Sequence, residues 1–121
     1  MYDGRSVAGP GRRASIRIER VLRRQFQRTG RLLDELPSEE GGSDHLPFEA
    51  AGVPIGGLDT GDEDVKSRRQ AQRHGGRAGA PPDPCYHRAC DTLKNVDHDV
   101  LTDMAQAAGA AIVALRAGPR R

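Results

Sequence analysis

The sequence predicts an α/β fold with more helix than its strands can cover. Residues 14–30 and 99–116 carry apolar side chains at helical spacing, whereas residues 31–37 and 53–58 are short runs with the composition of strands. The last helix needs a sheet to lie on, and two short strands form little of one. Only 36% of the 121 residues are apolar and none is Trp, so the core should be thin and the isolated chain poorly stable.

The N-terminal part divides into a loop and a helix. Residues 1–13 are rich in Gly, Pro and Arg without periodicity, which predicts a loop or a disordered segment. From Ala14 an apolar stripe follows the helical repeat, and Gly30 should end the helix. The stripe consists of Ile18, Val21, Leu22 and Phe26, with arginines around the other face.

The middle of the chain alternates short elements with loops. A strand over residues 31–37 is followed by an acidic Gly-rich loop, after which Ser43 or Asp44 should cap a short helical turn. Gly52 should close this turn.

A buried strand end and a long loop follow. Residues 53–58 should form the strand end, where Gly56 and Gly57 let backbone or ligand approach closely. Residues 59–84 read as a long loop with at most one short helix near 67–73, and such loops are usually functional or disordered.

Charges are segregated along the chain. Nine Arg lie between Arg5 and Arg31, whereas residues 34–64 hold ten Asp or Glu and no Lys or Arg. The Arg-rich helix makes a nucleic-acid or acidic-surface binding module an alternative function, and a non-catalytic interaction remnant is another. Arginines spread around the polar face, with no interleaved aromatic residue for base stacking, argue against nucleic acid as a partner.

Nothing in the sequence indicates membrane insertion or an export signal. No run of about 18 apolar residues occurs, so no membrane-spanning helix is expected. The N-terminus also lacks the apolar segment of a signal peptide, which by itself predicts a cytoplasmic chain.

The segment DPCYHRACDT, residues 83–92, holds both cysteines together with Tyr86 and His87. A zinc knuckle would need a second pair of ligands, and a thioredoxin-type dithiol would need two residues between the cysteines rather than four. A third interpretation is a disulfide that pins a tight loop and displays Tyr86 and His87 from its apex. From spacing alone, an exposed His beside a structural Tyr is the ordinary alternative.

Several motifs occur in order: GGSDHLPFEAAGVPIGGL at residues 41–58, DPCYHRACDTLKN at 83–95 and DHDVLTDMAQA at 97–107. With them, the chain from about Ile18 onward resembles the last third of the secreted bacterial two-zinc aminopeptidases, relatives of aminopeptidase Y of the leucine aminopeptidase type. The resemblance implies that residues 14–121 are the C-terminal fragment of a three-layer α/β/α zinc-peptidase fold, with most of the central sheet missing.

The resemblance also implies roles for the Cys-Tyr-His cluster. His87 would be a zinc ligand, Tyr86 would stabilise the tetrahedral intermediate, and Cys85 and Cys90 would form a disulfide. In the complete family domain, two zinc ions polarise the scissile carbonyl and ionise a water, and a carboxylate acts as general base. The reaction releases N-terminal amino acids from peptide substrates.

The matched segment departs from the family in its metal ligands. The other ligands and the catalytic base of the family lie upstream of the matched motifs, and this chain has no His before His45. At most a partial zinc site is therefore expected, because a catalytic zinc needs about three protein ligands. Glu39 and Glu40 imitate the catalytic Glu pair but read as a solvated acidic loop. The isolated chain should be inactive, as a truncated gene product, a piece of a split reading frame or a decayed copy.

The substrate-binding positions also depart from the family. Gly41 and Gly42 stand where the family has Gly-Arg, so Gly42 replaces a substrate-contacting Arg, and Asp59 replaces a Phe that walls the side-chain pocket. A carboxylate there should reject leucine-like side chains and favour cationic ones. Thr102 and Gln106 replace acidic residues that bind calcium in some members, so no calcium is expected.

The remaining histidines and the location complete the expectations. His45, His74 and His98 are expected not to ligate metal. The resemblance implies an exported, extracellular enzyme, and a disulfide would persist only in an oxidising compartment, although the chain shows no signal peptide.

Overall fold

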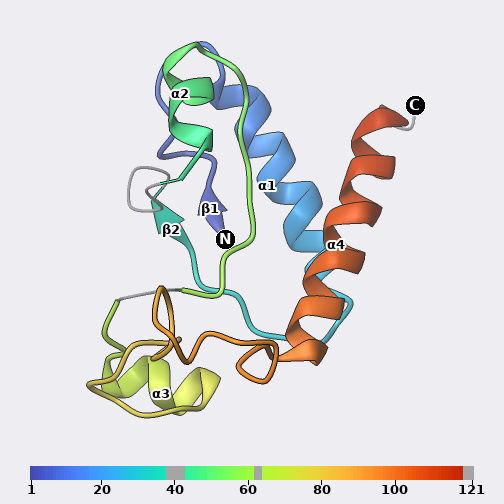
Figure 1. The fold of residues 1–121 in the computed structure, drawn as a ribbon. Coiled ribbons are helices and arrows are strands. Elements are labelled where there is room, and N and C mark those ends of the chain that lie inside the picture. The colour runs from blue at the N-terminus through green and yellow to red at the C-terminus, as the bar shows by residue number, and fades with distance from the viewer. Residues whose placement is uncertain (38–42, 62–63, 119–121) are drawn as a thin grey trace. The chain divides into compact units, whose positions relative to one another are not determined.

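The computed structural model describes residues 1–37, 43–61 and 64–118. Its elements, in chain order, are β1 (Tyr2–Asp3), α1 (Arg12–Gln27), β2 (Leu36–Pro37), α2 (His45–Ala50), α3 (Arg68–His74) and α4 (His98–Arg116), as Figure 1 shows. The chain divides into two compact units: residues 1–59 with 103–121 form unit 1, and residues 60–102 form unit 2. Each unit is described by itself.

Helix α1 confirms the predicted helix but ends before Gly30. It stops at Gln27, and the backbone N–H groups of Arg28, Thr29 and Gly30 each donate to the carbonyl three residues earlier, at 2.9–3.2 Å. This tighter turn satisfies carbonyls that a helix end leaves open, and Gly30 adopts the left-handed backbone that finishes the turn. Leu22 and Phe26 are buried, as the apolar stripe predicts.

The first residues contain a short strand that their composition does not predict. β1 pairs in parallel with β2, with Tyr2 opposite Leu36 and Asp3 opposite Pro37. The N–H of Leu36 donates to the carbonyl of Met1 at 2.9 Å, and Met1, Tyr2 and Val7 are all buried. The expectation of a loop or disordered segment over residues 1–13 missed this strand, because a two-residue strand is too short to show a period.

The strands are shorter than predicted. Only Leu36–Pro37 of the expected strand over residues 31–37 pairs with a neighbour. Residues 53–58 are extended without being a strand, although Gly57 accepts a hydrogen bond from the N–H of Tyr2 at 3.2 Å and Ile55 is buried. The described part of the chain is thus mostly helical, and its one pair of two-residue strands is shorter than the strands predicted at residues 31–37 and 53–58.

The core of unit 1 is small. It consists of Met1, Leu22 and Ala111, with Ile18, Val21, Leu33 and Leu58 packed around them. On α4, Ala107 and Ala111 are 3% and 1% exposed, so this helix packs against the core of unit 1 through alanines.

Two glycines let residues 53–58 pack closely, against side chains rather than against the backbone or ligand that the sequence predicts. A Cβ atom at Gly56 would lie 2.4 Å from Cγ2 of Ile18, and one at Gly57 would lie 2.7 Å from the ring of Tyr2. Both distances are shorter than a carbon contact allows, so only glycine fits at these places in unit 1.

Two buried polar side chains connect α1 to the loops beside it. Ser15 is fully buried; its Oγ donates to the carbonyl of Gly11 at 3.1 Å and accepts from the N–H of Ile55 at 3.0 Å. Glu19, 4% exposed, accepts from the N–H of Gly4 at 3.1 Å. Buried polar groups of this kind stabilise a fold only when their hydrogen bonds are made.

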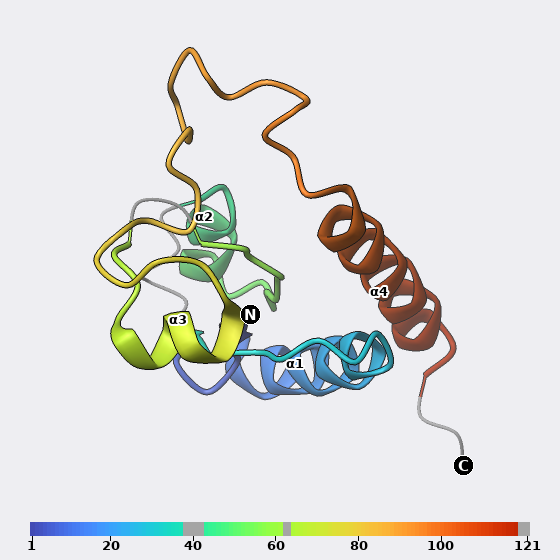
Figure 2. The ribbon, with the colours of Figure 1, turned by 90° about the horizontal axis from the view of Figure 1, so that it is seen from below.

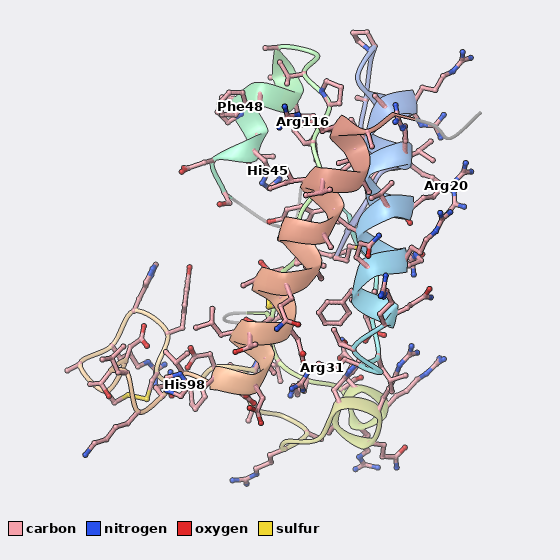
Figure 3. The ribbon with its side chains drawn as sticks, turned by 90° about the vertical axis from the view of Figure 1, so that its right-hand side faces the viewer. Arg20, Arg31, His45, Phe48, His98 and Arg116 are labelled. Atoms are coloured by element: carbon pink, nitrogen blue, oxygen red, sulfur yellow. A yellow bond between two sulfur atoms is a disulfide. The ribbon has the colours of Figure 1, made fainter. Side chains whose placement is uncertain are left out.

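Arginine and carboxylate side chains extend these connections. Arg23 donates to Glu19 at 2.9 Å and to Glu35 at 2.6 Å. Arg31, labelled in Figure 3, pairs with Asp103 and so links the segment after α1 to α4 within unit 1.

The remaining helices follow their local signals to different degrees. α2 begins after Asp44, whose side chain makes no capping bond, and Gly52 follows it in the left-handed conformation. α3 lies near residues 67–73 as predicted, where the Ser67 hydroxyl and the Gln70 side chain form a capping box. No helix in the described ranges is long and apolar enough to cross a membrane.

Candidate functional site

The cysteine cluster lies in the loop between α3 and α4, which is drawn in orange in Figure 2. This loop belongs to unit 2. Cys85 and Cys90 form a disulfide with their Cα atoms 5.3 Å apart, and neither thiol is free. The bridge closes a short loop, and this favours the third sequence-based interpretation over a zinc knuckle. The N–H of Arg88 donates to the carbonyl of Cys85 at 2.9 Å and tightens the same loop.

His87 has an unusual backbone conformation at the apex of this loop. Its φ is +55°, and it is the one non-glycine residue with positive φ among the described residues. A left-handed backbone is unfavourable for a residue with a Cβ atom, and such positions persist only where the surroundings impose them. The disulfide and the Cys85–Arg88 turn close the loop on either side of this residue, and the His87 side chain is exposed.

The Tyr86 ring stacks on the imidazole of His87. Their ring centroids are 3.9 Å apart and the planes are inclined by 19°. Tyr86 is half-buried while His87 is exposed, so the tyrosine orients the histidine from the protein side. The loop therefore brings a phenol and an imidazole together, which can donate a hydrogen bond and ligate a metal, respectively.

Asp83 and Asn95 brace the base of the loop. Asp83 Oδ1 accepts from the N–H of Cys85 at 2.8 Å and from the Asn95 amide at 3.0 Å, and Asn95 also donates to Asp91 at 3.3 Å. The hydrogen bond from Asn95, followed by that from the Cys85 N–H, lowers the pKa of Asp83. Sequence reasoning did not single out this pair, although an Asp two residues before a turn commonly bonds the backbone N–H there.

The described residues do not form a complete metal site. Within residues 1–37, 43–61 and 64–118, no group of three or more His, Cys, Asp or Glu side chains is placed to hold an ion. His87 can supply one ligand, whereas a catalytic zinc needs about three from protein. The described part of the chain therefore falls short of the ligand number that a catalytic zinc requires.

The other predicted site residues belong to unit 1 or fall outside the described residues. Asp59 is exposed at the end of residues 1–59 in unit 1, whereas Tyr86 and His87 belong to unit 2. Gly41 and Gly42, with Glu39 and Glu40, fall outside the described residues.

The other three histidines have ordinary surroundings. The His45 ring lies 4.4 Å from that of Tyr2, in unit 1 (labelled in Figure 3), and so packs against an aromatic neighbour. His74 ends α3 and His98 begins α4, and both are exposed. The structure gives none of the three a set of metal-binding neighbours in its described ranges.

One open cavity of about 290 Å³ lies in unit 1, between residues 8–10 and α2. Leu46 and Glu49 line it, and the Glu49 carboxylate accepts from the N–H of Ala8 at 3.3 Å. Of the predicted site residues that the structure describes, none is among the residues that line this cavity.

A family model described as peptidase family M28 matches residues 7–112, which include the whole Cys-Tyr-His loop and its Asp83–Asn95 brace. The chain belongs to peptidase family M28. The match begins before Ile18, so the M28 part of the chain is longer at its N-terminal end than the sequence motifs indicated.

Curated relatives agree with M28 membership. The chain is 39% identical over 102 residues to leupeptin-inactivating enzyme 1 of Streptomyces exfoliatus, covering 84% of this chain and 23% of that protein. It is 37% identical to an aminopeptidase of Pseudomonas aeruginosa, with coverages of 82% and 18%. It is 40% identical to a probable lipoprotein aminopeptidase, LpqL, of Mycobacterium tuberculosis, with coverages of 72% and 17%. The chain thus spans about a fifth of the length of these M28 relatives.

Proposed function

We propose that this chain is the C-terminal part of the catalytic domain of a zinc-dependent aminopeptidase that releases N-terminal residues from peptides. One observation carries the proposal: within a chain that belongs to family M28, a disulfide-bridged loop presents Tyr86 and His87 side by side. The names of two relatives, both aminopeptidases, support the same reaction class.

Within this proposal, the two loop residues have distinct roles. His87 is the zinc ligand, because its imidazole is exposed and its backbone is held in place by the bridge. Tyr86 is a hydrogen-bond donor to the oxyanion of the reacting peptide, because its phenol lies beside the ligand. The remaining ligands and the general base come from outside the residues described here, so the isolated chain is inactive.

The proposal includes the three-layer α/β/α fold of residues 14–121. Large apolar side chains on α4 support it, since Leu101, Ile112 and Val113 are 54%, 67% and 69% exposed. A soluble helix rarely leaves so many large apolar groups in water unless another layer covers them. The missing part of the sheet is a suitable cover, and without it the chain is poorly stable.

We place the enzyme outside the cytoplasm. The Cys85–Cys90 bridge favours an oxidising compartment, and one relative carries the word lipoprotein in its name. Asp59 and Gly42 at the proposed substrate positions favour peptides with a cationic N-terminal side chain over leucine-like ones. Calcium is not required.

A chimera tests the function. The matching C-terminal segment of the Pseudomonas aeruginosa aminopeptidase is replaced by this chain, and hydrolysis of lysine and leucine p-nitroanilides is measured with and without a chelator. We expect chelator-sensitive activity that His87→Ala abolishes, that Tyr86→Phe reduces by about 100-fold, and that the control His98→Ala leaves unchanged. A chimera that folds, as judged by circular dichroism, but stays inactive would refute the proposed function.

A further inference from the structure

Helix α1 carries a row of arginines on its exposed side. The row consists of Arg13, Arg17, Arg20, Arg24 and Arg28, the last at the C-cap, and all five are exposed. They follow one another at intervals of three or four residues. With 3.6 residues per turn, these positions fall within an arc of about 80° on the helix surface. Figure 3 shows Arg20 pointing outward from α1.

This arginine row lies opposite the buried face of the helix. Ser15, Glu19, Leu22 and Phe26 are the buried residues of α1, and their positions are centred about 180° from the row. The sequence predicts arginines spread around the polar face. The structure separates one inward arginine, Arg23, which bonds Glu19 and Glu35, from five exposed arginines that share a single narrow strip.

Among the residues that the structure describes, no ion pair neutralises the arginine row. In the described part of the chain the ion pairs are Arg23 with Glu19 and Glu35, and Arg31 with Asp103, and none involves the row. Like charges three or four residues apart destabilise a helix. Arg13 also lies in the first turn, which holds no acidic residue and where the helix dipole disfavours a cation. The row therefore weakens α1 unless an anionic partner neutralises it.

The spacing of the arginines along α1 fits one class of anionic partner better than the others. Five cations spaced by 4.5–6 Å over roughly 22 Å of helix axis match a linear polyanion. A protein partner would need an apolar centre to its interface, and this strip offers none. Stable attachment to a membrane would need an apolar face free to insert, and the apolar face of α1 is buried in unit 1.

We infer that the arginine row of α1 binds the phosphate backbone of double-stranded DNA, without sequence preference. Guanidinium groups form charge-assisted, bidentate hydrogen bonds with phosphate oxygens. The absence of aromatic side chains from the row limits the contact to the backbone, since nothing there can stack on bases. This binding does not depend on the proposed peptidase function.

Counterion release makes the inference quantitative. The logarithm of the association constant should fall with the logarithm of the salt concentration, with a slope of about −0.9 per neutralised phosphate. Five contacts predict a slope of about −4.5, and removal of two arginines predicts about −2.7.

The test measures fluorescence anisotropy of a labelled DNA duplex of random sequence with the full chain, from about 0.05 to 0.2 M salt. The variant is Arg17→Gln with Arg20→Gln. The matched control is Arg68→Gln with Arg69→Gln, which removes the same charge from exposed positions on α3. Helix content and the unfolding midpoint of both variants are measured first, and we expect neither to fall.

Each outcome decides the inference. The inference is supported if the chain shows the predicted slope, if the slope becomes shallower in the Arg17/Arg20 variant, and if the control keeps the slope of the chain. An equal loss in both variants would show that net charge alone attracts the DNA, and would overturn it. Tighter binding to heparin or to phosphatidylserine vesicles than to DNA, or no binding at the lowest salt, would also overturn it.

Discussion

The buried hydroxyl of Ser15 gives the sharpest test of how unit 1 is held together. Ser15 is 0% exposed, and its Oγ is the acceptor for the N–H of Ile55 at 3.0 Å and a donor to Gly11 at 3.1 Å. Ser15→Ala removes this oxygen and leaves the Ile55 N–H buried without that acceptor. A buried donor left unsatisfied costs about 1–3 kcal/mol.

The measurement is urea and thermal unfolding followed by circular dichroism. A loss of 1 kcal/mol lowers the midpoint by about 4–8 °C in a domain of 60–100 residues, so Ser15→Ala should melt at least about 4 °C below the parent chain. The control is Ser43→Ala, at an exposed position just before α2, which should change stability by less than about 0.5 kcal/mol. Equal midpoints for the two variants would refute the argument that this bond secures residues 53–58 to α1.

Three further predictions concern single positions. Gly56→Ala should destabilise unit 1 by about 1–3 kcal/mol in urea unfolding, because its Cβ would lie 2.4 Å from Ile18; an unchanged midpoint would contradict that packing. His87→Gly should be more stable than His87→Ala by about 0.5–1 kcal/mol, because glycine accepts φ of +55° at no steric cost; the reverse order would contradict the left-handed apex. Asp83 has a pKa below its ordinary 3.8 in the folded loop, so its contribution to stability is present above that pH and is lost as the pH falls through the lowered value. NMR signals of Tyr86 should report this transition, and a variant Asp83→Asn that keeps the same acid transition would exclude Asp83 as its source.

Local sequence signals predicted the helices well, because each helix carries its own information. The apolar repeat placed α1, at most one short helix was expected near residues 67–73, where α3 forms, and an apolar face predicted α4 within one residue of its observed start at His98. The strands were predicted less well. The partner of β1 lies 34 residues along the chain, at Leu36, and no local pattern specifies such a pairing.

The candidate site shows the same division. Residue types and their order indicated the Cys85, Tyr86, His87 and Cys90 cluster and its family. The Asp83–Asn95 brace was missed because Asp and Asn are ordinary loop residues until the fold brings them together.

By itself, the sequence determined where α1, α3 and α4 form, the resemblance that led to family M28, and the potential of His87 as a ligand. These features depend on residue type and on spacing along the chain. Only the tertiary structure decided that Ser15 and Glu19 are buried with their bonds made and that His87 has a left-handed backbone. It alone also decided that Arg23 pairs with Glu19 and Glu35. Burial, strain and charge pairing depend on which segments meet in space, and the sequence of any one segment does not contain that information.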